Sequence, residues 1–273
     1  MSIITISRGS YSKGREIAEK VAQKLGYNCI SRDIILKASE HFNLPEIKLV
    51  RAIHDAPSIL DRLTHGKDGK ISYMRLSLLR HFQKDNVVYH GLSGHFFVKD
   101  ISHVLKVRII ADMDDRIKLE MQREKISREE ARRILRSDDE QRRRWSKYLY
   151  GIDTKDPSLY DLVLHIRKIG VDEAVNVICH AVNLEIFQTT PESQKAMNDL
   201  LLAAEVKMAL GDLGANLEIS ANAGMIEIRQ GPKSKQQTHI KEIKANAQKV
   251  PGVVGVKFIE SIQTDYTNPW HKM

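Results

Sequence analysis

Residues 3–27 read IITISRGSYSKGREIAEKVAQKLGY, which combines a strand-like run, a polar loop and a helical pattern. Residues 3–6 are short and β-branched, as in a buried strand. Ile17 and Val21 lie four apart on the apolar face of an expected amphipathic helix, which Gly26 ends as a C-cap. A Gly/Ser/Lys-rich loop between a strand and a helix is the layout of a phosphate-binding loop.

The loop differs from the common pattern G-x-x-x-x-G-K-[ST]. Gly9 and Gly14 have the required spacing, but Arg15 and Glu16 follow in place of lysine and a hydroxyl residue. Arginine supplies the positive charge in a different shape. Glutamate cannot replace a hydroxyl beside magnesium without changing the local charge. We interpret the segment as a phosphate loop; the alternative is a tight turn that binds nothing.

The composition is that of a globular protein with one large or two modest domains. Of its 273 residues, 42% are hydrophobic and 29% charged. We find no apolar run of about 18 residues and no secretory leader, so we expect a cytoplasmic protein. The two cysteines, Cys29 and Cys179, lie far apart without ligand-type neighbours, which argues against a disulfide scaffold or a zinc site. We identify no set of metal ligands.

The net charge of +8 is concentrated in the first two thirds of the chain. Residues 188–273 hold ten Lys/Arg and nine Asp/Glu, so seven of the eight net charges belong to residues 1–187. A basic first domain suits an anionic ligand, either nucleotide phosphate or nucleic acid. A merely solvated basic surface explains the charge equally well.

Short apolar runs alternate with helix-length amphipathic sequence over the first domain. They occupy residues 3–6, 87–89, 104–111 and 161–166. Continuous apolar strands separated by helices predict a parallel sheet covered on both faces. Ser127 and Glu130 form a capping box that begins a long charged helix or a pair of helices.

The sequence changes character at residues 187–194, FQTTPESQ, which we interpret as a linker. A helix is expected at about 193–210, then two strands around a turn near Asn222–Gly224, a helix at about 235–248 and a last strand. We therefore expect two domains, residues 1–187 and residues 192–273, the second a small α+β domain.

The loop and the segments after it resemble the cytidylate-kinase-like family. Ser7, Arg8, Ser12 and the run GREI at 14–17 match the family's opening. The further matches are SRDII at 31–35, VVYHGLSG at 87–94, the stretch from VRIIADMDDR through RRRWSKYLYG at 107–151, and YDLVLHIRKIGVDEAVNVI at 160–178. The resemblance covers about residues 1–187.

This resemblance implies an α/β fold, a P-loop NTPase-type three-layer parallel sheet of five strands with a substrate-binding insertion and a lid. It implies transfer of the ATP γ-phosphoryl group to a nucleoside monophosphate such as CMP or dCMP, with Mg²⁺. The implied catalytic residues are Lys13, Arg15 and Arg142. The implied ATP phosphate-binding residues are Gly9, Ser10, Tyr11, Ser12, Lys13, Gly14, Arg15 and Glu16. Arg32 and Asp33 would contact the acceptor nucleotide, and Arg142, Arg143 and Arg144 would form the lid.

Each of these assignments has a structural alternative. The spacing of Asp139/Arg143 and of Glu140/Arg144 is that of ordinary i,i+4 surface pairs. For Arg32, the alternative is that it only caps the start of a helix. Histidines beside a glycine turn, such as His90 and His95, are more often structural than catalytic.

Several positions depart from the family pattern. Tyr11 and Lys13 replace loop glycines, and Leu92 follows Gly91 where the family has arginine. The last strand ends in residues 165–167, HIR, in place of small polar residues. A lost arginine removes a charge-assisted phosphate contact, so these changes affect the expected catalysis more than the fold.

The last segment resembles a BON domain, in the helix–strand pair–helix order and the ending VPGVVGVKFIESI at 250–262. The resemblance implies a ligand-sensing or membrane-surface module. Its near-neutral charge offers no polybasic attraction to anionic lipid. A docking or homo-oligomerisation module is an equal alternative.

Three functional hypotheses remain at this point. The first is an ATP-dependent nucleoside monophosphate kinase, and the second is a catalytically impaired nucleotide-binding regulator. The third is a nucleic-acid-binding protein that uses the arginine-rich segment, which we do not expect because acidic residues are interspersed there.

Overall fold

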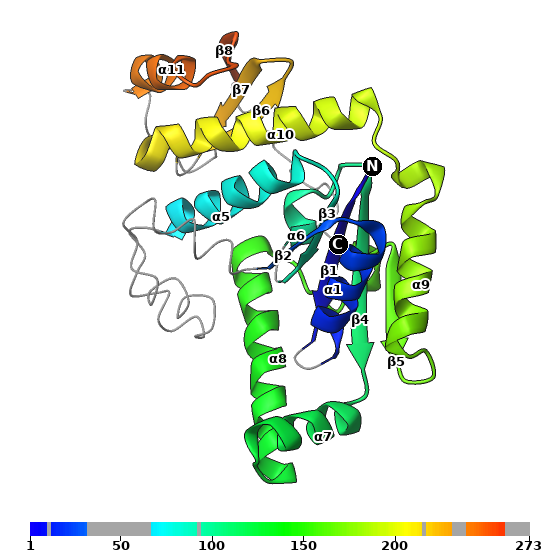
Figure 1. The fold of residues 1–273 in the computed structure, drawn as a ribbon. Coiled ribbons are helices and arrows are strands. Elements are labelled where there is room, and N and C mark those ends of the chain that lie inside the picture. Colours follow the sequence, from blue (N-terminus) through cyan, green and yellow to red (C-terminus); the bar gives the residue numbers. More distant parts are fainter. Residues whose placement is uncertain (10–11, 32–66, 92–93, 215–216, 231–238, 260–273) are drawn as a thin grey trace, which may run out of the picture. The chain divides into compact units, whose positions relative to one another are not determined.

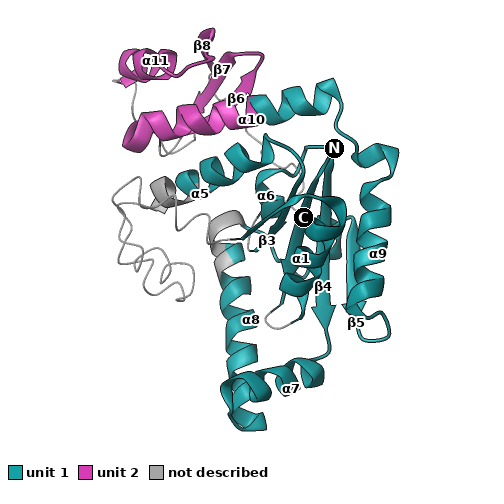
Figure 2. Cartoon of the chain, in the orientation of Figure 1, with its two compact units in different colours: residues 1–198 teal, residues 199–273 magenta. Residues whose placement is uncertain are grey.

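The computed structural model describes residues 1–9, 12–31, 67–91, 94–214, 217–230 and 239–259 (Figure 1). The chain divides into two compact units, residues 1–198 and 199–273 (Figure 2). The longer elements of the first unit are, in chain order, β1 (Ile3–Arg8), α1 (Gly14–Leu25), β2 (Asn28–Ser31), α5 (Lys67–Phe82), β3 (Val87–His90), α6 (Gly94–Phe97), β4 (Val104–Ala111), α7 (Met113–Glu124), α8 (Arg128–Tyr150), β5 (Leu162–Ile166) and α9 (Val171–Val182).

The first unit contains a five-stranded parallel sheet with the order β2-β3-β1-β4-β5. The apolar runs of the sequence correspond to β1, β3, β4 and β5, so the predicted parallel sheet is confirmed. β2 is not such a run, because it lies at the edge of the sheet and only Ile30 of its four residues is buried. β1 occupies the centre, where Ile3 pairs with Val87 of β3 and with Val104 of β4.

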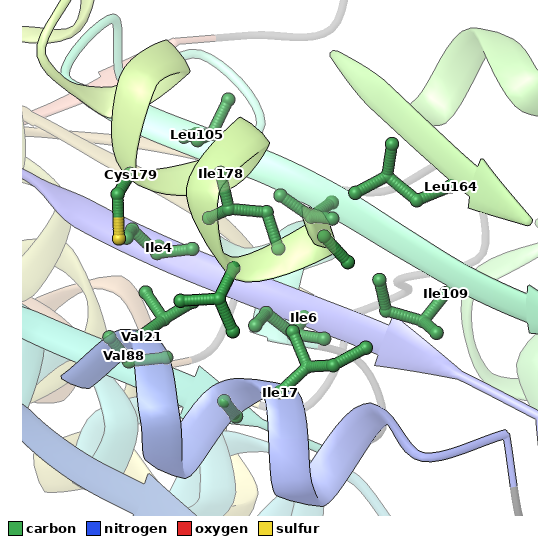
Figure 3. Close-up of a cluster of buried hydrophobic side chains, with 14 of the residues drawn as sticks. Ile4, Ile6, Ile17, Val21, Val88, Leu105, Ile109, Leu164, Ile178 and Cys179 are labelled. Atoms are coloured by element: carbon green, nitrogen blue, oxygen red, sulfur yellow. The ribbon is translucent and has the colours of Figure 1, made fainter. Parts of the chain in front are cut away.

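One face of the sheet is covered by α1 and α9 (Figure 3). Ile17 and Val21 of α1, both fully buried, lie with Ile178 of α9 against the side chains of Ile4 and Ile6 on β1. Each such side chain contributes roughly 1.5–3 kcal/mol through the apolar surface that it removes from water. The helix expected from the spacing of Ile17 and Val21 is confirmed.

The opposite face is covered by α6, which contacts β1, and by the end of α5, which contacts α6 and β3. The ring of Phe82 meets that of Tyr89 edge-on, with centroids 5.9 Å apart. Both rings are fully buried. The expected three-layer arrangement, helix on sheet on helix, is therefore present.

The expected helix after Ser127 is one continuous element, α8, rather than a pair. The Ser127 hydroxyl accepts a hydrogen bond from the Glu130 backbone N–H at 3.2 Å, as the capping box predicts. α8 packs against α7, and both helices lie between β4 and β5 in the sequence. We call α7 and α8 the lid helices.

The second unit contains most of α10 (Pro191–Leu210), then β6 (Leu217–Asn222), β7 (Met225–Gln230), α11 (Ile240–Gln248) and β8 (Gly255–Ile259). β7 pairs antiparallel with β6 and parallel with β8. Ala223 and Gly224 both have positive φ, 48° and 82°, as a two-residue hairpin loop requires. The expected elements of this segment are confirmed.

The described helices include none that is both long enough and apolar enough to cross a bilayer.

Candidate active site

The loop between β1 and α1 presents a helix N-terminus. Lys13 is the N-cap of α1, in the left-handed conformation with φ 61° and ψ 9°, and its side chain makes no capping hydrogen bond. The first intrahelical bond runs from the Ile17 N–H to the Lys13 carbonyl at 3.0 Å. The N–H groups of the first turn before it have no acceptor within the helix, and they give this end a partial positive charge. Such an end attracts anions.

The strand order places this loop at the point where the direction of strand addition reverses. From β1 the chain continues toward β2 on one side, whereas β4 leads to β5 on the other. In open parallel sheets, ligands bind beyond the carboxyl ends of the strands at such a switch point. Arg8 ends β1 and Ala111 ends β4, so the loop that follows Arg8 lies at the expected ligand-binding edge.

Packing explains the second loop glycine. A Cβ on Gly14 would lie 2.8 Å from the Cβ of Arg8, too close for any other residue without a shift of β1 or α1. Ser12 is fully buried and donates a hydrogen bond to the Gly9 carbonyl at 3.1 Å, which closes the loop on itself. Ser10 and Tyr11 lie outside the described residues.

The three charged side chains of the loop and first turn are exposed. Arg15 Nε donates to Glu19 at 2.8 Å, and Glu16 lies 3.6 Å from Lys20 Nζ. Both are i,i+4 pairs on the solvent side of α1, where such contacts are weak. Lys13 is exposed at the N-terminus of the helix. Arg15 therefore points along the helix surface in this structure.

The lid helices reach the loop through two arginines. Arg142 Nη1 donates to the carbonyl of Arg8 at 3.3 Å. Arg116 of α7 donates to both oxygens of Asp139 on α8, at 2.8 and 2.9 Å. The Arg116 guanidinium carbon lies 3.6 Å from the position that a Cβ on Gly9 would take. Two positive side chains thus lie next to the first residues of the loop.

The other two lid arginines contact carboxylates. Arg144 Nε donates to Glu140 at 3.0 Å, which confirms the surface-pair alternative for these two residues. The alternative for Arg143 is wrong: its Nε donates to Asp153 at 2.9 Å, while Asp139 is taken by Arg116. The Lys155 backbone N–H and the Arg143 guanidinium lower the pKa of Asp153 to about 2.

Arg32 and Asp33, the expected contacts to the acceptor, lie outside the described residues, as does Leu92. His95 is buried, and its Nε2 has no hydrogen-bond partner among the described residues. Burial, followed by the charges of Arg108 and Lys106, lowers the pKa of His95 to about 3, so the ring is neutral near pH 7.

A polar cluster that the sequence did not reveal lies beside His95. Arg108 Nη1 donates to the hydroxyls of Ser7 and Tyr160, at 3.2 Å each. Tyr160 in turn donates to the carbonyl of Thr154 at 3.0 Å. The cluster fixes the segment after α8 to β1 and β4. The sequence signal for it is weak: Arg108 is one of two basic residues, with Lys106, in the mainly apolar strand β4.

His165 and Arg167, at the end of β5, both contact the carboxylate of Asp112. His165 Nε2 lies 3.0 Å from Asp112, which follows β4, and Arg167 Nη1 lies 3.1 Å from the other oxygen of Asp112. These three residues occupy the carboxyl edge of β4 and β5. In the part of the chain that the structure describes, His, Cys, Asp and Glu form no group of three or more that could hold a metal ion.

Comparison with known proteins covers the same region. The family model described as the cytidylate kinase-like family matches residues 3–168. A cytidylate kinase of Archaeoglobus fulgidus is 29% identical over 187 residues, which cover 67% of this chain and 95% of that enzyme. A cytidylate kinase of Sulfolobus acidocaldarius is 26% identical over 182 residues, 66% of this chain and 93% of that enzyme.

Among solved structures, an uncharacterized protein from Eubacterium ventriosum is similar, with a TM-score of 0.52 and 19% identity. The match covers 68% of this chain and all of that protein. At this identity, the similarity concerns the fold.

Proposed function

As the chain belongs to the cytidylate kinase-like family, we propose that its first unit transfers the γ-phosphoryl group of ATP to a nucleoside monophosphate. Family membership supports nucleotide kinase activity in general. The names of the two archaeal relatives favour a cytidine acceptor, CMP or dCMP.

One observation carries the proposal: a helix N-terminus and two arginines from the lid helices converge on the same loop. Arg142 contacts the last residue of β1, and Arg116 lies against Gly9. Phosphoryl transfer needs mainly positioning and cations that offset the charge spreading over the transferred group. The helix end and Arg142 can supply the positive charge, and Arg116, which is bound to Asp139, can supply positioning.

The roles of the side chains follow from their positions. Lys13, exposed at the N-cap of α1, is proposed to reach the outer phosphates of ATP. Arg142 is proposed to exchange its contact with the Arg8 carbonyl for one with the transferred phosphoryl group. Arg15 has to leave Glu19 to contribute, and the weakness of an exposed pair permits this. Arg32 and Asp33 remain the proposed contacts to the acceptor.

ATP and Mg²⁺ are the proposed cosubstrate and metal. Magnesium in kinases is held largely by the substrate phosphates and by one or two protein carboxylates, so a preformed cage is not needed. Glu16 is an exposed carboxylate in the first turn of α1, 3.6 Å from Lys20 Nζ, and it fits this role. When bound, the ion neutralises phosphate charge.

A second function, nucleotide binding without catalysis, is favoured by specific contacts. Arg142 is bonded to a backbone carbonyl, and Arg15 is paired along the surface of α1. A protein in which these contacts persist after ATP binds would keep the nucleotide but lack the cations that stabilise the transition state. Such a chain would act as a nucleotide-dependent regulator.

A coupled assay of ADP formation separates the two functions. Purified protein is mixed with Mg-ATP and, in turn, CMP, dCMP, UMP, AMP and GMP. Turnover that requires CMP or dCMP supports the kinase. If no acceptor is phosphorylated while ATP still raises the melting temperature, the regulator is supported and the kinase is refuted.

For residues 192–273 we propose a BON-like module that binds a ligand or a second copy of the chain. Cα partners on one face of its sheet carry opposite charges, Glu218 with Arg229 and Glu227 with Lys257. Such pairs favour a hydrated surface over contact with lipid. Size-exclusion chromatography with light scattering of the full chain, compared with a chain that ends after residue 190, tests the dimer.

A further inference from the structure

We propose that Arg116 and Asp139 form a positioning pair that holds Arg142 of the lid at the phosphate loop. The inference rests on the proposed function, because it assigns the source of the lid's alignment in that reaction. Arg116 and Asp139 act in it through Arg142 and are not themselves catalytic residues.

The pair has the geometry of a fixed contact. Two parallel hydrogen bonds, 2.8 and 2.9 Å long, join the guanidinium to the carboxylate. The side chain of Arg116 is 9% exposed and that of Asp139 is 30% exposed. A bidentate arginine–carboxylate contact specifies orientation as well as distance. Partial burial reduces the screening by solvent that weakens surface pairs.

The pair and Arg142 belong to the same face of α8. Asp139 and Arg142 are three residues apart, a spacing that places both side chains on one side of a helix. From that side, Asp139 binds Arg116, which lies against Gly9, and Arg142 reaches the carbonyl of Arg8 at 3.3 Å. Rotation of α8 about its axis would break both contacts together. The Arg116–Asp139 pair therefore fixes the rotation that presents Arg142.

Asp114 of α7 forms two further ion pairs with α8, to Arg128 and Arg132, and among the described residues it has no contact with the loop. Arg128, the first residue of α8, lies 2.7 Å from Asp114 in the first turn of α7. Both side chains are about half exposed. If the Arg116–Asp139 contact served only to hold α7 and α8 together, removal of either carboxylate would have similar consequences for activity. Asp114 thus offers a matched control for Asp139.

The first experiment compares Asp139→Asn with Asp114→Asn in the full-length protein. We expect Asp139→Asn to lower kcat about 100-fold, the effect of a misplacement of about 1 Å at a reacting centre, with a smaller change in KM for ATP. Asp114→Asn should retain the activity of the unchanged protein. Equal activity of the two variants, with both folded by circular dichroism, would overturn the proposal.

A double-mutant cycle excludes a merely structural role. In an Arg142→Ala background, Asp139→Asn should change kcat by no more than about twofold, because the side chain it positions is gone. Arg116→Lys keeps the charge but loses the bidentate contact. In the Arg142→Ala background it should likewise change kcat by no more than about twofold. Losses that multiply independently of Arg142 would refute the positioning role.

Binding separates this inference from the proposed function. If the unchanged protein phosphorylates no acceptor, the kinase proposal fails, and the pair is tested by calorimetry with the non-hydrolysable analogue adenylyl imidodiphosphate. Asp139→Asn should then weaken binding at least tenfold relative to Asp114→Asn. Equal affinities, or no binding to the unchanged protein, would overturn the inference.

Discussion

Replacement of Lys13 by glycine should make the protein more stable and, at the same time, weaken its binding of ATP. Lys13 holds φ at 61°, in the left-handed region. This conformation destabilises an L-residue by roughly 1–2 kcal/mol, and glycine adopts it without that cost. The greater freedom of glycine in the unfolded chain lowers the free energy of unfolding by roughly 0.4–1 kcal/mol. The net gain is about 1 kcal/mol, or about 2–4 °C in the Tm of a unit of this size.

The loss of affinity follows from the missing charge. A hydrogen bond between a charged group and phosphate contributes roughly 1.5–3 kcal/mol. Its removal should raise the Kd for ATP about 10- to 100-fold. Urea unfolding measures the first effect, and calorimetric titration with ATP measures the second.

Lys125→Gly is the matched control. Lys125 has φ 56° at the C-cap of α7 and is also exposed, but it lies away from the loop. It should gain similar stability with no change in affinity for ATP. Destabilisation by Lys13→Gly would refute the backbone argument, and an unchanged Kd would refute the proposed contact with phosphate.

Three further predictions concern stability. Ile17→Ala should lose roughly 2–5 kcal/mol in urea unfolding because Ile17 is fully buried, whereas exposed Ile186→Ala should change stability by less than about 0.5 kcal/mol. A Cβ at Gly94 would lie 2.3 Å from Cδ1 of the buried Tyr89 ring, so Gly94→Ala should cost roughly 1–3 kcal/mol, and a variant with an unchanged urea midpoint would contradict this packing. Because the pKa of His95 falls from 6.5 to about 3 on folding, the unfolded state binds the extra proton, and stability should fall as pH drops below 6.5. The loss is roughly 2 kcal/mol by pH 5, and His95→Gln should flatten the pH dependence in the same urea assay.

Local patterns predicted most of the fold. The buried strands β1, β3, β4 and β5 are apolar runs, and α1 and α8 have visible caps at Gly26 and Ser127. The pattern of apolar runs does not predict β2, because an edge strand can be mostly polar and exposed. The polar composition around Pro191 predicts a linker, but Pro191 begins α10, since proline suits the first turn of a helix.

The candidate site was harder to predict because its contacts join distant segments. The sequence favoured Asp139 as a partner of Arg143, four residues away, yet the carboxylate binds Arg116, 23 residues earlier. Only the packing of α7 on α8 brings those side chains together. Arg108 and Tyr160 likewise meet across β4 and the segment before β5. The spacing of residues in the sequence predicts contacts within one helix or strand, but not contacts between residues of different elements.

The central position of β1 has a consequence for synthesis of the chain. Its partners are residues 87–90 on one side and 104–109 on the other, so IITISR emerges long before either neighbour exists. Until about a hundred further residues have been translated, a β-branched segment with two unsatisfied edges waits in the nascent polypeptide, where pairing with other chains competes with folding. We therefore expect chaperone binding to β1 during synthesis to favour folding of this unit.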